Sequence, residues 1–346
     1  MSDKPALLII RFSAMGDVAM TAPVIQEFAA QYPQVSLIMV SRPLFAPFFK
    51  GIPNLDFHAF DPKSKHKGFP GLIKLFFELR KKRVTAVADL HNNLRSRILS
   101  ILFFFCGIKT VRVDKARKEK KELTRKENKV LRPLKQMSDR YASVFAALGF
   151  PFKLTHTLPT AAPAILSDQI LTLTGSYQPG KWLGISPFAQ HLQKIYPLQK
   201  MEAVLLALAT AGYRLFVFGG GIQEKEIAAE WALKHHHIVP VIGLLNLEQE
   251  LDLISNLDLM LSMDSSGMHL ASLKGIPVVS IWGATHPYAG FLGYGQSLND
   301  VVQTDLYCRP CSVYGNKPCY RGDLACMNNL SETVVITSII NKLNHG

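Results

Sequence analysis

The stretch "ALLIIRFSAMGDVAMTAPVIQEFAAQYP", residues 6–33, runs from five apolar residues through a turn of small residues into a helix-forming segment. The same order recurs in "YRLFVFGGGIQEKEIAAEWALKHH", residues 213–236. Short aliphatic runs that alternate with helical segments are typical of βαβ units on a parallel sheet. These two stretches therefore predict an α/β fold.

Further aliphatic runs extend this pattern through both halves of the chain. The predicted strands are 7–11, 35–40, 84–89, 182–186, 215–218, 257–262 and 278–282. Three prolines between residues 151 and 163 mark a linker, since proline-rich stretches interrupt regular structure. We place the boundary near residue 160 and predict two Rossmann-like domains with doubly wound parallel sheets, 1–160 and 161–346. Such sheets bind ligands beyond the carboxyl ends of their strands.

The bulk composition limits the class of protein. Of 346 residues, 48% are hydrophobic and 19% are charged, which supports folded cores and excludes a disordered chain. The longest apolar run, Ile98–Cys106, is well short of the roughly 20 residues of a spanning helix, and we expect Cys106 to be buried. The amino-terminal apolar run is too short for a secretory signal. We expect a cytoplasmic protein that contacts a membrane surface.

Positive charge is concentrated in one segment. The net charge is +13, and residues 109–135 contain 12 lysines or arginines against four acidic residues. This segment is either a solvated charged loop or a docking surface for a polyanion such as a phospholipid or a phosphorylated glycolipid. Nucleic acid is disfavoured, because the segment has no interleaved aromatic residues and no nucleic-acid-binding motif lies nearby.

A strand-to-helix turn in the second half carries polar residues suited to an anion. The stretch "MDSSGMHLASLKG" provides Asp264, Ser265, Ser266, Gly267 and His269. Either serine can cap the helix, Gly267 permits close approach of a ligand, and the helix N-terminus favours negative charge. An ordinary structural cap with a buried core histidine is the alternative interpretation.

The first-half turn repeats this design with Asp17 at the start of a helix. An aspartate there is usually a cap, yet the same position stabilises a carboxylate that can accept a proton from a hydroxyl. Asp17 is therefore a candidate general base. Pro23 predicts that the regular helix begins near Thr21, which leaves Asp17 in an irregular turn.

Two further turns complete the candidate site. Gly219–Gly221 follow a strand without the GxGxxG fingerprint, and a carboxylate after such a turn, Glu224, can hold ribose hydroxyls. In "ISPFAQHLQKIYP", residues 185–197, Lys194 is a suitable point charge for a phosphate, although lone lysines are usually surface residues.

With these turns in this order, the chain resembles glycosyltransferase family 9, the heptosyltransferases of lipopolysaccharide inner-core assembly. The resemblance covers most of the chain and rests on "RFSAMGDVAMTAPV", "DLHNNLRSRIL", "ISPFAQHLQKIYP", "FGGGIQEKE" and "MDSSGMHLASLKGIPVVSIWGATHP". It implies a GT-B fold of two facing domains, an acceptor-binding N-terminal one and a nucleotide-sugar-binding C-terminal one. The implied reaction is an inverting sugar transfer without a required cofactor, from ADP-heptose to a lipid A glycolipid.

The resemblance also implies roles for single residues. Asp17 matches the base. Donor-binding residues are Ser186, Gln190, Lys194, Gly220, Glu224, Asp264, Ser265, Ser266, Gly267 and His269. Acceptor-binding residues are Ser13, Met15, Gly16 and Arg95. No Asp-x-Asp metal motif is evident, so Lys194 and backbone amides would neutralise the phosphates.

The implied partners are a nucleotide sugar, a phosphorylated glycolipid and the cytoplasmic face of the inner membrane. Residues 109–135 and the amphipathic "GLIKLFFELRKKRV", residues 71–84, suit such a membrane-embedded acceptor. Two alternatives remain at this point: a GT-B nucleotide-sugar epimerase and a non-catalytic glycolipid-binding protein.

Four of the five cysteines lie close together in the sequence, at Cys308, Cys311, Cys319 and Cys326. Four thiols at such intervals can hold a structural zinc, although the spacing is not that of a standard zinc ribbon. The alternatives are reduced thiols or a redox-dependent disulfide, and a cytoplasmic location argues against stable disulfides.

Overall fold

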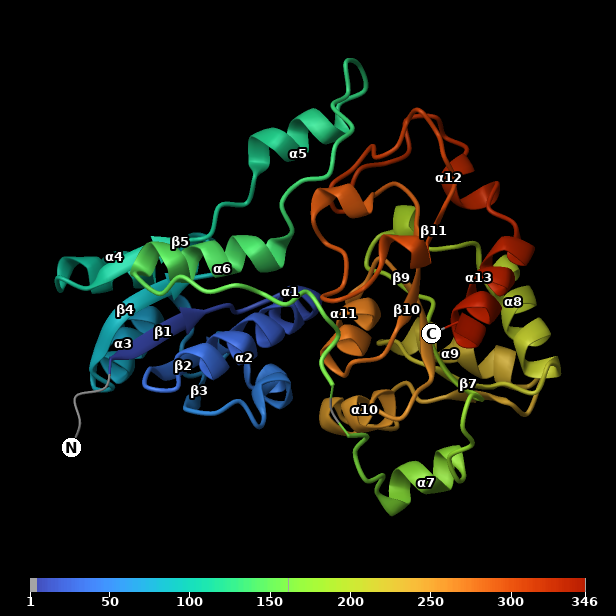
Figure 1. Ribbon diagram of the computed structural model, residues 1–346, viewed down its shortest axis with the longest axis horizontal. Helices are drawn as coiled ribbons and strands as arrows, with labels where there is room; N and C mark the ends of the chain where they lie inside the picture. Colours follow the sequence, from blue (N-terminus) through green and yellow to red (C-terminus); the bar gives the residue numbers. More distant parts are fainter. Residues whose placement is uncertain (1–4, 161, 346) are drawn as a thin grey trace. The chain divides into compact units, whose positions relative to one another are not determined.

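The computed structural model of the chain describes residues 5–160 and 162–345 (Figure 1). By its internal contacts the chain forms two compact units. The first contains Met1–Lys115 and Lys135–His156, and the second contains Ala116–Leu134 and Thr157–Gly346. The chain thus changes units after His156, near the expected boundary, but it also contributes an inserted segment to the second unit that the sequence assigned to the first. Residue 161, where the second domain was expected to begin, lies outside the described residues.

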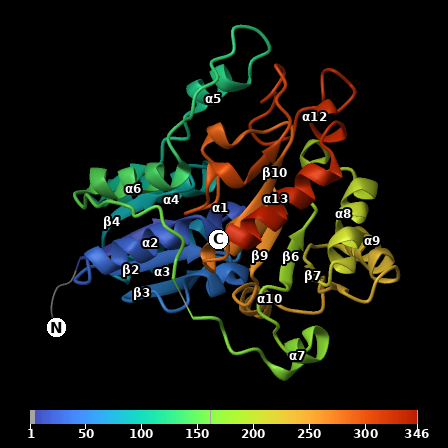
Figure 2. The same cartoon turned by 45° about the vertical axis from the view of Figure 1, so that its right-hand side comes forward.

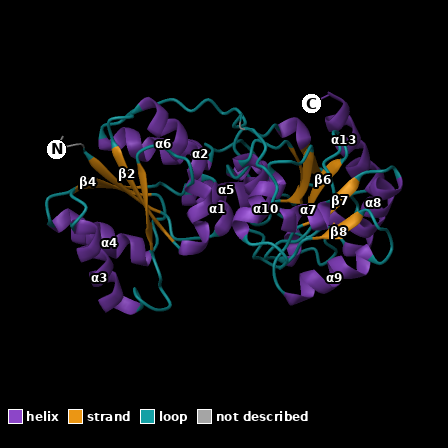
Figure 3. Cartoon of the chain, turned by 90° about the horizontal axis from the view of Figure 1, so that it is seen from below, coloured by secondary structure: helices purple, strands orange, loops and turns teal. Residues whose placement is uncertain are grey.

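The first unit is a parallel five-stranded sheet in the order β3-β2-β1-β4-β5. Its elements are β1 (Ala6–Ile10), α1 (Met15–Ala19), α2 (Thr21–Gln31), β2 (Ser36–Ser41), the 3₁₀ helix η1 (Pro43–Phe49), β3 (Leu55–Ala59), α3 (Gly68–Arg80), β4 (Val84–Asp89), α4 (Leu94–Phe105), β5 (Lys109–Arg112) and α6 (Met137–Leu148). Figure 3 shows α2 and α6 on one face of this sheet and α3 and α4 on the other.

Burial on both faces explains why β1 is apolar at every position. All five of its residues are buried, and Leu8 lies opposite Ile38 of β2 and Val87 of β4. The side chains of these strands pack against Leu75 and Leu79 of α3 and against α4. A central strand covered by helices on both faces reads as a continuous apolar run.

The second unit contains a parallel six-stranded sheet in the order β11-β10-β9-β6-β7-β8. Its elements are α5 (Arg117–Thr124), α7 (Asp168–Thr174), β6 (Trp182–Ser186), η2 (Leu192–Lys194), α8 (Leu198–Thr210), β7 (Arg214–Val217), α9 (Ile222–Ala232), β8 (Ile238–Pro240), α10 (Leu247–Ile254), β9 (Leu259–Met263), α11 (Ser266–Leu273), β10 (Val278–Trp282), η3 (Pro287–Ala289), η4 (Leu298–Asp300), β11 (Val301–Gln303), α12 (Ala325–Asn328) and α13 (Glu332–His345).

The second core lies between this sheet and the helices α8, α9 and α13. Its fully buried side chains include Ile185 of β6, Val204 of α8, Leu261 of β9 and Val335 of α13. The carboxyl-terminal helix α13 lies beside α8 (Figure 2). Each unit therefore has a hydrophobic core of its own.

The inserted segment Ala116–Leu134 is anchored to the second unit by a few residues, although most of its lysines and arginines are exposed to solvent. Leu123 and Leu134 pack against Ala289. Lys129 Nζ donates to the carbonyl oxygens of Cys308 at 2.8 Å and Pro310 at 2.9 Å. Lys129 is thus held by specific contacts, whereas nine of the twelve lysines and arginines in residues 109–135 are exposed.

The apolar run Ile98–Cys106 forms most of α4 and does not span a membrane. No helix in the described part of the chain is long and apolar enough to cross one. The expected burial of Cys106 is wrong, because this cysteine is exposed just after the end of α4. Phe104 and Phe105 beside it are exposed too.

Candidate active site

The predicted base lies in the turn that follows β1. Asp17 is the third residue of the short helix α1, and the longer helix α2 begins at Thr21. The predicted start of the regular helix is therefore confirmed, but Asp17 sits in a helical turn of its own and not in an irregular one. Ser13, Met15 and Gly16 occupy the same turn, in partly exposed positions.

Asp17 forms an ion pair with Arg11, a residue that the sequence interpretation missed. Arg11 is buried and donates a hydrogen bond of 2.7 Å to the carbonyl oxygen of Leu90. Burial lowers the pKa of Arg11, but the charge of Asp17 and other nearby groups outweighs it, so the pKa is raised overall. The guanidinium thus stays charged and favours the ionised carboxylate. The sequence signal that could have identified Arg11 is its position, a charged residue directly after a wholly buried strand.

The turn after β4 is held rigid by a buried carboxylate. Asp89 accepts hydrogen bonds from the backbone amides of His91 at 3.0 Å and Asn92 at 2.7 Å, and from the Ser96 hydroxyl at 2.9 Å. Asn93 caps α4 in a reciprocal arrangement with Ser96. In the motif "DLHNNLRSRIL", these hydrogen bonds therefore fix the residue at which α4 begins.

His91 joins the turns after β1 and β4. Its Nδ1 accepts a hydrogen bond of 3.2 Å from the backbone amide of Phe12. Burial, and then the charge of Arg11, lower the pKa of His91 to about 3, so the ring is neutral at physiological pH. Arg95 is exposed in the first turn of α4, at the same edge of the sheet as Asp17, because β4 is the neighbour of β1.

In the second unit, two of the predicted donor-binding residues form an ion pair. Lys194 Nζ lies 3.0 Å from Asp264 Oδ2, and their side chains are only 16% and 8% exposed. Lys194 is in η2 after β6, and Asp264 follows β9, the neighbouring strand. The sequence identified each residue but not the pair.

The start of α11 differs from the sequence interpretation in two details. A Cβ added to Gly267 would lie 2.2 Å from Ser186 Oγ, so the glycine is needed for close packing against β6 and not for approach of a ligand on that side. Ser265 is the N-cap residue of α11 but makes no side-chain capping hydrogen bond. Its hydroxyl lies 3.5 Å from that of Ser262 instead. His269 is buried within α11.

The glycine turn after β7 is closed by the carboxylate that follows it. Glu224, in the first turn of α9, accepts a hydrogen bond of 2.6 Å from the backbone amide of Gly220. Ser186 ends β6, and Gln190 is exposed in the loop after it. Because β7, β6 and β9 are adjacent and parallel, these residues and Asp264 lie at one edge of the sheet.

Arg309, also missed from the sequence, attaches the cysteine-rich segment to this edge. Its buried guanidinium donates to the carbonyl oxygens of Trp282, Gly283, Thr285 and Thr304 and to the side chain of Gln303. Within the same segment, a Cβ on Gly315 would lie 2.5 Å from the aliphatic stem of Lys194. The segment therefore restricts where the Lys194 side chain can lie.

Of the alternatives left open for the four clustered cysteines, the structure shows free thiols. All are free, and no three of their Sγ atoms come within 4.8 Å of one another, a separation that only one group of described residues satisfies. Burial raises the pKa of Cys326 to about 11 and also raises the pKa of Cys311, which favours the neutral thiols.

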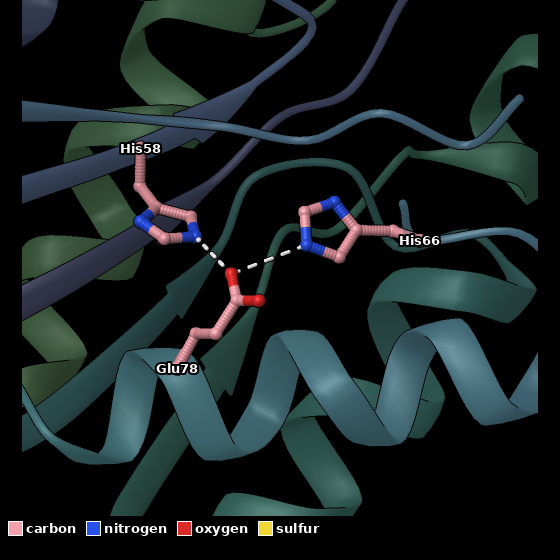
Figure 4. Close-up of side chains that lie close together, drawn as sticks. All are labelled: His58, His66 and Glu78. Atoms are coloured by element: carbon pink, nitrogen blue, oxygen red, sulfur yellow. Dashed lines mark hydrogen bonds and ion pairs between the residues drawn. The ribbon is translucent and has the colours of Figure 1, made fainter. Parts of the chain in front are cut away.

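In the described residues, the side chains of His58, His66 and Glu78 bring three potential ligand atoms within 4.8 Å of one another (Figure 4). Nε2 of His58 lies 3.3 Å and Nε2 of His66 lies 3.2 Å from the same Glu78 oxygen. However, His66 Nδ1 accepts a hydrogen bond of 3.0 Å from the Asp61 amide, which places the ring proton on Nε2. His66 thus donates to Glu78 and is not a metal ligand in this arrangement. The cluster ties the loop before α3 to that helix.

Comparison with known proteins shows which family the chain matches. The family model described as glycosyltransferase family 9 (heptosyltransferase) matches residues 72–319. The chain is 26% identical over 294 residues to the lipopolysaccharide core heptosyltransferase OpsX of Haemophilus influenzae, which covers 82% of this chain and 80% of that protein.

Two solved structures resemble the whole chain. A family 9 glycosyl transferase from Veillonella parvula has a TM-score of 0.77 and 17% identity, over 100% of this chain and 99% of that one. The Escherichia coli heptosyltransferase WaaC, solved with ADP, has a TM-score of 0.65 and 19% identity. The match covers 97% of this chain and 99% of that one. Together with the two parallel sheets, these neighbours confirm the predicted α/β fold of the GT-B type.

Proposed function

Because the chain belongs to glycosyltransferase family 9 and is a glycosyltransferase, we propose that it transfers heptose from ADP-heptose to the inner core of a lipid A glycolipid. The observation that carries the proposal is the carboxylate of Asp17, held by buried Arg11 where the strands of the first sheet end. Ligands of such sheets bind at this edge. The relatives OpsX and WaaC, by their names, act on heptose.

In the proposed reaction, Asp17 accepts the proton of the acceptor hydroxyl as that oxygen attacks the anomeric carbon. The new glycosidic C–O bond forms while the bond to the diphosphate breaks, and ADP leaves with the bonding electrons. A single displacement inverts the anomeric configuration. The role of Arg11 is to keep the carboxylate ionised and to fix its position before the reaction.

The second unit would hold the donor. Lys194 and the backbone amides at the start of α11 supply positive charge for the diphosphate, which makes a metal unnecessary. Glu224 would bind ribose hydroxyls through the carboxylate oxygen that does not accept the Gly220 amide. The other proposed donor-binding residues are Ser186, Gln190, Gly220, Asp264, Ser265, Ser266, Gly267 and His269. Phosphate oxygens would share the Lys194 ammonium with Asp264.

The first unit would hold the acceptor through Ser13, Met15, Gly16 and Arg95. These residues lie in the turns after β1 and β4, and the exposed Arg95 guanidinium suits a phosphorylated sugar. A lipid A acceptor is embedded in a bilayer, so the proposal places the protein in the cytoplasm, peripherally bound to the inner membrane.

A thermal-shift screen tests the donor assignment, because a ligand that binds only the native state raises its apparent stability. The purified protein is heated with ADP, UDP, GDP, CMP or TDP, and with ADP-heptose. We expect selective stabilisation by ADP and ADP-heptose, followed by heptose transfer when a lipid A core acceptor is added. A selective shift with UDP would overturn the donor and favour the epimerase alternative. Stabilisation without transfer to any core acceptor would favour the glycolipid-binding alternative.

A further inference from the structure

The two helices on one face of the first sheet expose large apolar side chains. On α3, Phe69 is 60% and Phe77 is 53% exposed, although the opposite side of this helix is buried in the core. On α4 the exposed residues are Leu94, Ile101, Phe104 and Phe105, the last at 81%. These six residues are called the α3–α4 surface. A folded protein has no packing reason to expose so many large apolar residues on neighbouring helices.

The two helices lie side by side, so their exposed residues belong to one area of the molecule. Figure 3 shows α3 and α4 on the same face of the sheet, and the rings of Phe76 and Phe103 meet between them at 5.0 Å. Phe77 and Phe104 are the next residue along each helix. On α4, Leu94, Ile101 and Phe105 are seven and four residues apart, a spacing that puts them on one side of the helix.

Exposed cations follow the α3–α4 surface in the sequence, and exposed carboxylates are absent from residues 68–112. Arg80, Lys81 and Arg83 are exposed where α3 ends, and Lys109 is exposed soon after α4. Residues 68–112, all of them described, contain only two carboxylates. Glu78 is engaged by Lys65 and His66, and Asp89 is fully buried. Residues 68–112 therefore contribute a net positive charge to this face.

We propose that the α3–α4 surface is the membrane-docking face of the protein and that its partner is a bilayer containing anionic phospholipids. Phenylalanine and leucine side chains insert at the boundary of headgroups and acyl chains, while neighbouring lysine and arginine side chains bind lipid phosphates. A second copy of the chain fits less well, because its α3–α4 surface carries the same positive charge, whereas an anionic bilayer carries the opposite one. The docking face deepens the proposed function and rests on its bilayer-embedded acceptor.

This inference places the main membrane contact on the α3–α4 surface and not on the inserted segment Ala116–Leu134, which carries much of the basic charge noted in the sequence. Lys120 is buried over the ring of Phe291 at 4.0 Å, and Lys129 is hydrogen-bonded to backbone carbonyls. Both are occupied within the second unit, although the other lysines and arginines of this segment are exposed. On the α3–α4 surface, several large apolar side chains are exposed on two neighbouring helices whose sequence also carries exposed cations, which is the combination that an interface requires.

Vesicle co-sedimentation of the full chain tests the proposal. The triple variant Phe77→Ser, Phe104→Ser, Phe105→Ser is compared with Ile165→Ser, Ile222→Ser, Leu233→Ser, whose residues are at least as exposed but lie in the second unit. The vesicles contain phosphatidylethanolamine and phosphatidylglycerol, with phosphatidylcholine vesicles as the neutral reference.

We expect the α3–α4 triple to weaken binding to the anionic vesicles by about tenfold or more, and the second-unit triple to bind like the wild type. Replacement of Arg80, Lys81 and Arg83 by Gln should weaken binding too, and added salt should weaken the wild type. Equal binding by both Phe and Ile/Leu triples would overturn the proposal. So would sedimentation showing a wild-type dimer that the α3–α4 triple dissociates.

A separate measurement keeps this test independent of the proposed reaction. Transfer from ADP-heptose to a deacylated, water-soluble core acceptor needs no bilayer, so the α3–α4 triple should retain it. Vesicle binding without any transfer would contradict the proposed function and leave the docking face supported. Transfer without vesicle binding by the wild type would do the reverse.

Discussion

The ion pair between Arg11 and Asp17 determines how the candidate base is presented. Arg11 is buried at the end of β1 and is tied to the carbonyl of Leu90 at the end of β4. The position of the Asp17 carboxylate is therefore set by two strands and not by its own short helix alone. A base that is fixed and ionised before substrate arrives loses little entropy when it reacts.

Asp17→Asn tests the role of the carboxylate. The amide keeps the size of the side chain but cannot accept the proton, so we expect turnover to fall by about 10²–10⁴ while stabilisation by ADP is retained. Heptose transfer and thermal shift measure the two effects. Asp168→Asn is the control, because Asp168 is also in the first turn of a helix but is exposed in the second unit. Full activity of Asp17→Asn would show that another group is the base.

Variants of the Lys194–Asp264 ion pair should change the stability of the protein and its binding of the donor to different extents. Lys194→Met leaves a largely buried carboxylate without its cation, so we expect a loss of about 2–3 kcal/mol in the free energy of unfolding and no stabilisation by ADP. The double variant Lys194→Met, Asp264→Asn removes the uncompensated charge and should recover most of the stability without recovering the ADP effect. Urea unfolding with and without ADP measures both quantities. If the double variant regained the ADP effect, Lys194 would not be a phosphate ligand.

The lowered pKa of His91 predicts that the protein loses stability in acid. Its pKa is about 3 in the folded protein and 6.5 in the unfolded chain, so the unfolded chain binds the proton more tightly. The stability from the neutral ring is fully present above pH 6.5 and is lost as the pH falls toward 3. At pH 4 the expected loss from this residue is about 3 kcal/mol.

His91→Asn should flatten this pH dependence, because the asparagine oxygen can still accept from the Phe12 amide but does not titrate. Denaturant unfolding between pH 7 and pH 4 measures the slope. His236→Asn, at an exposed histidine, is the control and should retain the wild-type slope. Equal slopes for His91→Asn and the wild type would mean that other groups dominate the acid response.

At the scale of elements, the contact of α11 with β6 requires a glycine, which has no side chain, at position 267. In Gly267→Ala the new Cβ would meet Ser186 Oγ at 2.2 Å, so α11 or the end of β6 must move. We expect a destabilisation of about 1–3 kcal/mol, as in other overpacked cores. Gly220→Ala is the control, because a Cβ there has nothing within 4 Å. Thermal unfolding of both variants, and of Gly267→Ala with Ser186→Gly, checks the argument: only the double variant should recover.

The strands that were predicted from the sequence and those that were missed differ in their position in the sheet. All seven predicted strands are present, as β1, β2, β4, β6, β7, β9 and β10. The four that were missed, β3, β5, β8 and β11, are the four edge strands. Edge strands are short and partly exposed, as in "KTVR" of β5, so they lack the continuous apolar run that marks a strand covered on both faces.

At the scale of the whole molecule, each unit has its own core, and the segment Ala116–Leu134 belongs to the unit that its sequence neighbours do not. Independent cores predict two transitions in scanning calorimetry. ADP at about 100 times its Kd should stabilise the second unit by about 2.7 kcal/mol and shift its transition alone. Lys194→Met should abolish the shift. A single transition, or equal shifts of both, would contradict independent units or the donor assignment.

The sequence by itself determined the α/β class, the central strands, and the turns that contain Asp17, Lys194, Glu224 and Asp264. These features depend on local patterns, because a buried parallel strand is uniformly apolar and ligand-binding turns follow it directly. The same patterns supported the family resemblance that the family match confirms.

Tertiary structure alone decided which charges meet. Arg11 with Asp17, Lys194 with Asp264, and Arg309 with the carbonyls after β10 join residues from different turns or set their side-chain directions, which no local pattern records. It also decided that the apolar end of α4 faces solvent and that no three of the four cysteine sulfurs lie within 4.8 Å of one another. The physical reason is that burial and pairing depend on which surfaces the fold brings into contact, whereas sequence periodicity reports only the two faces of a single element.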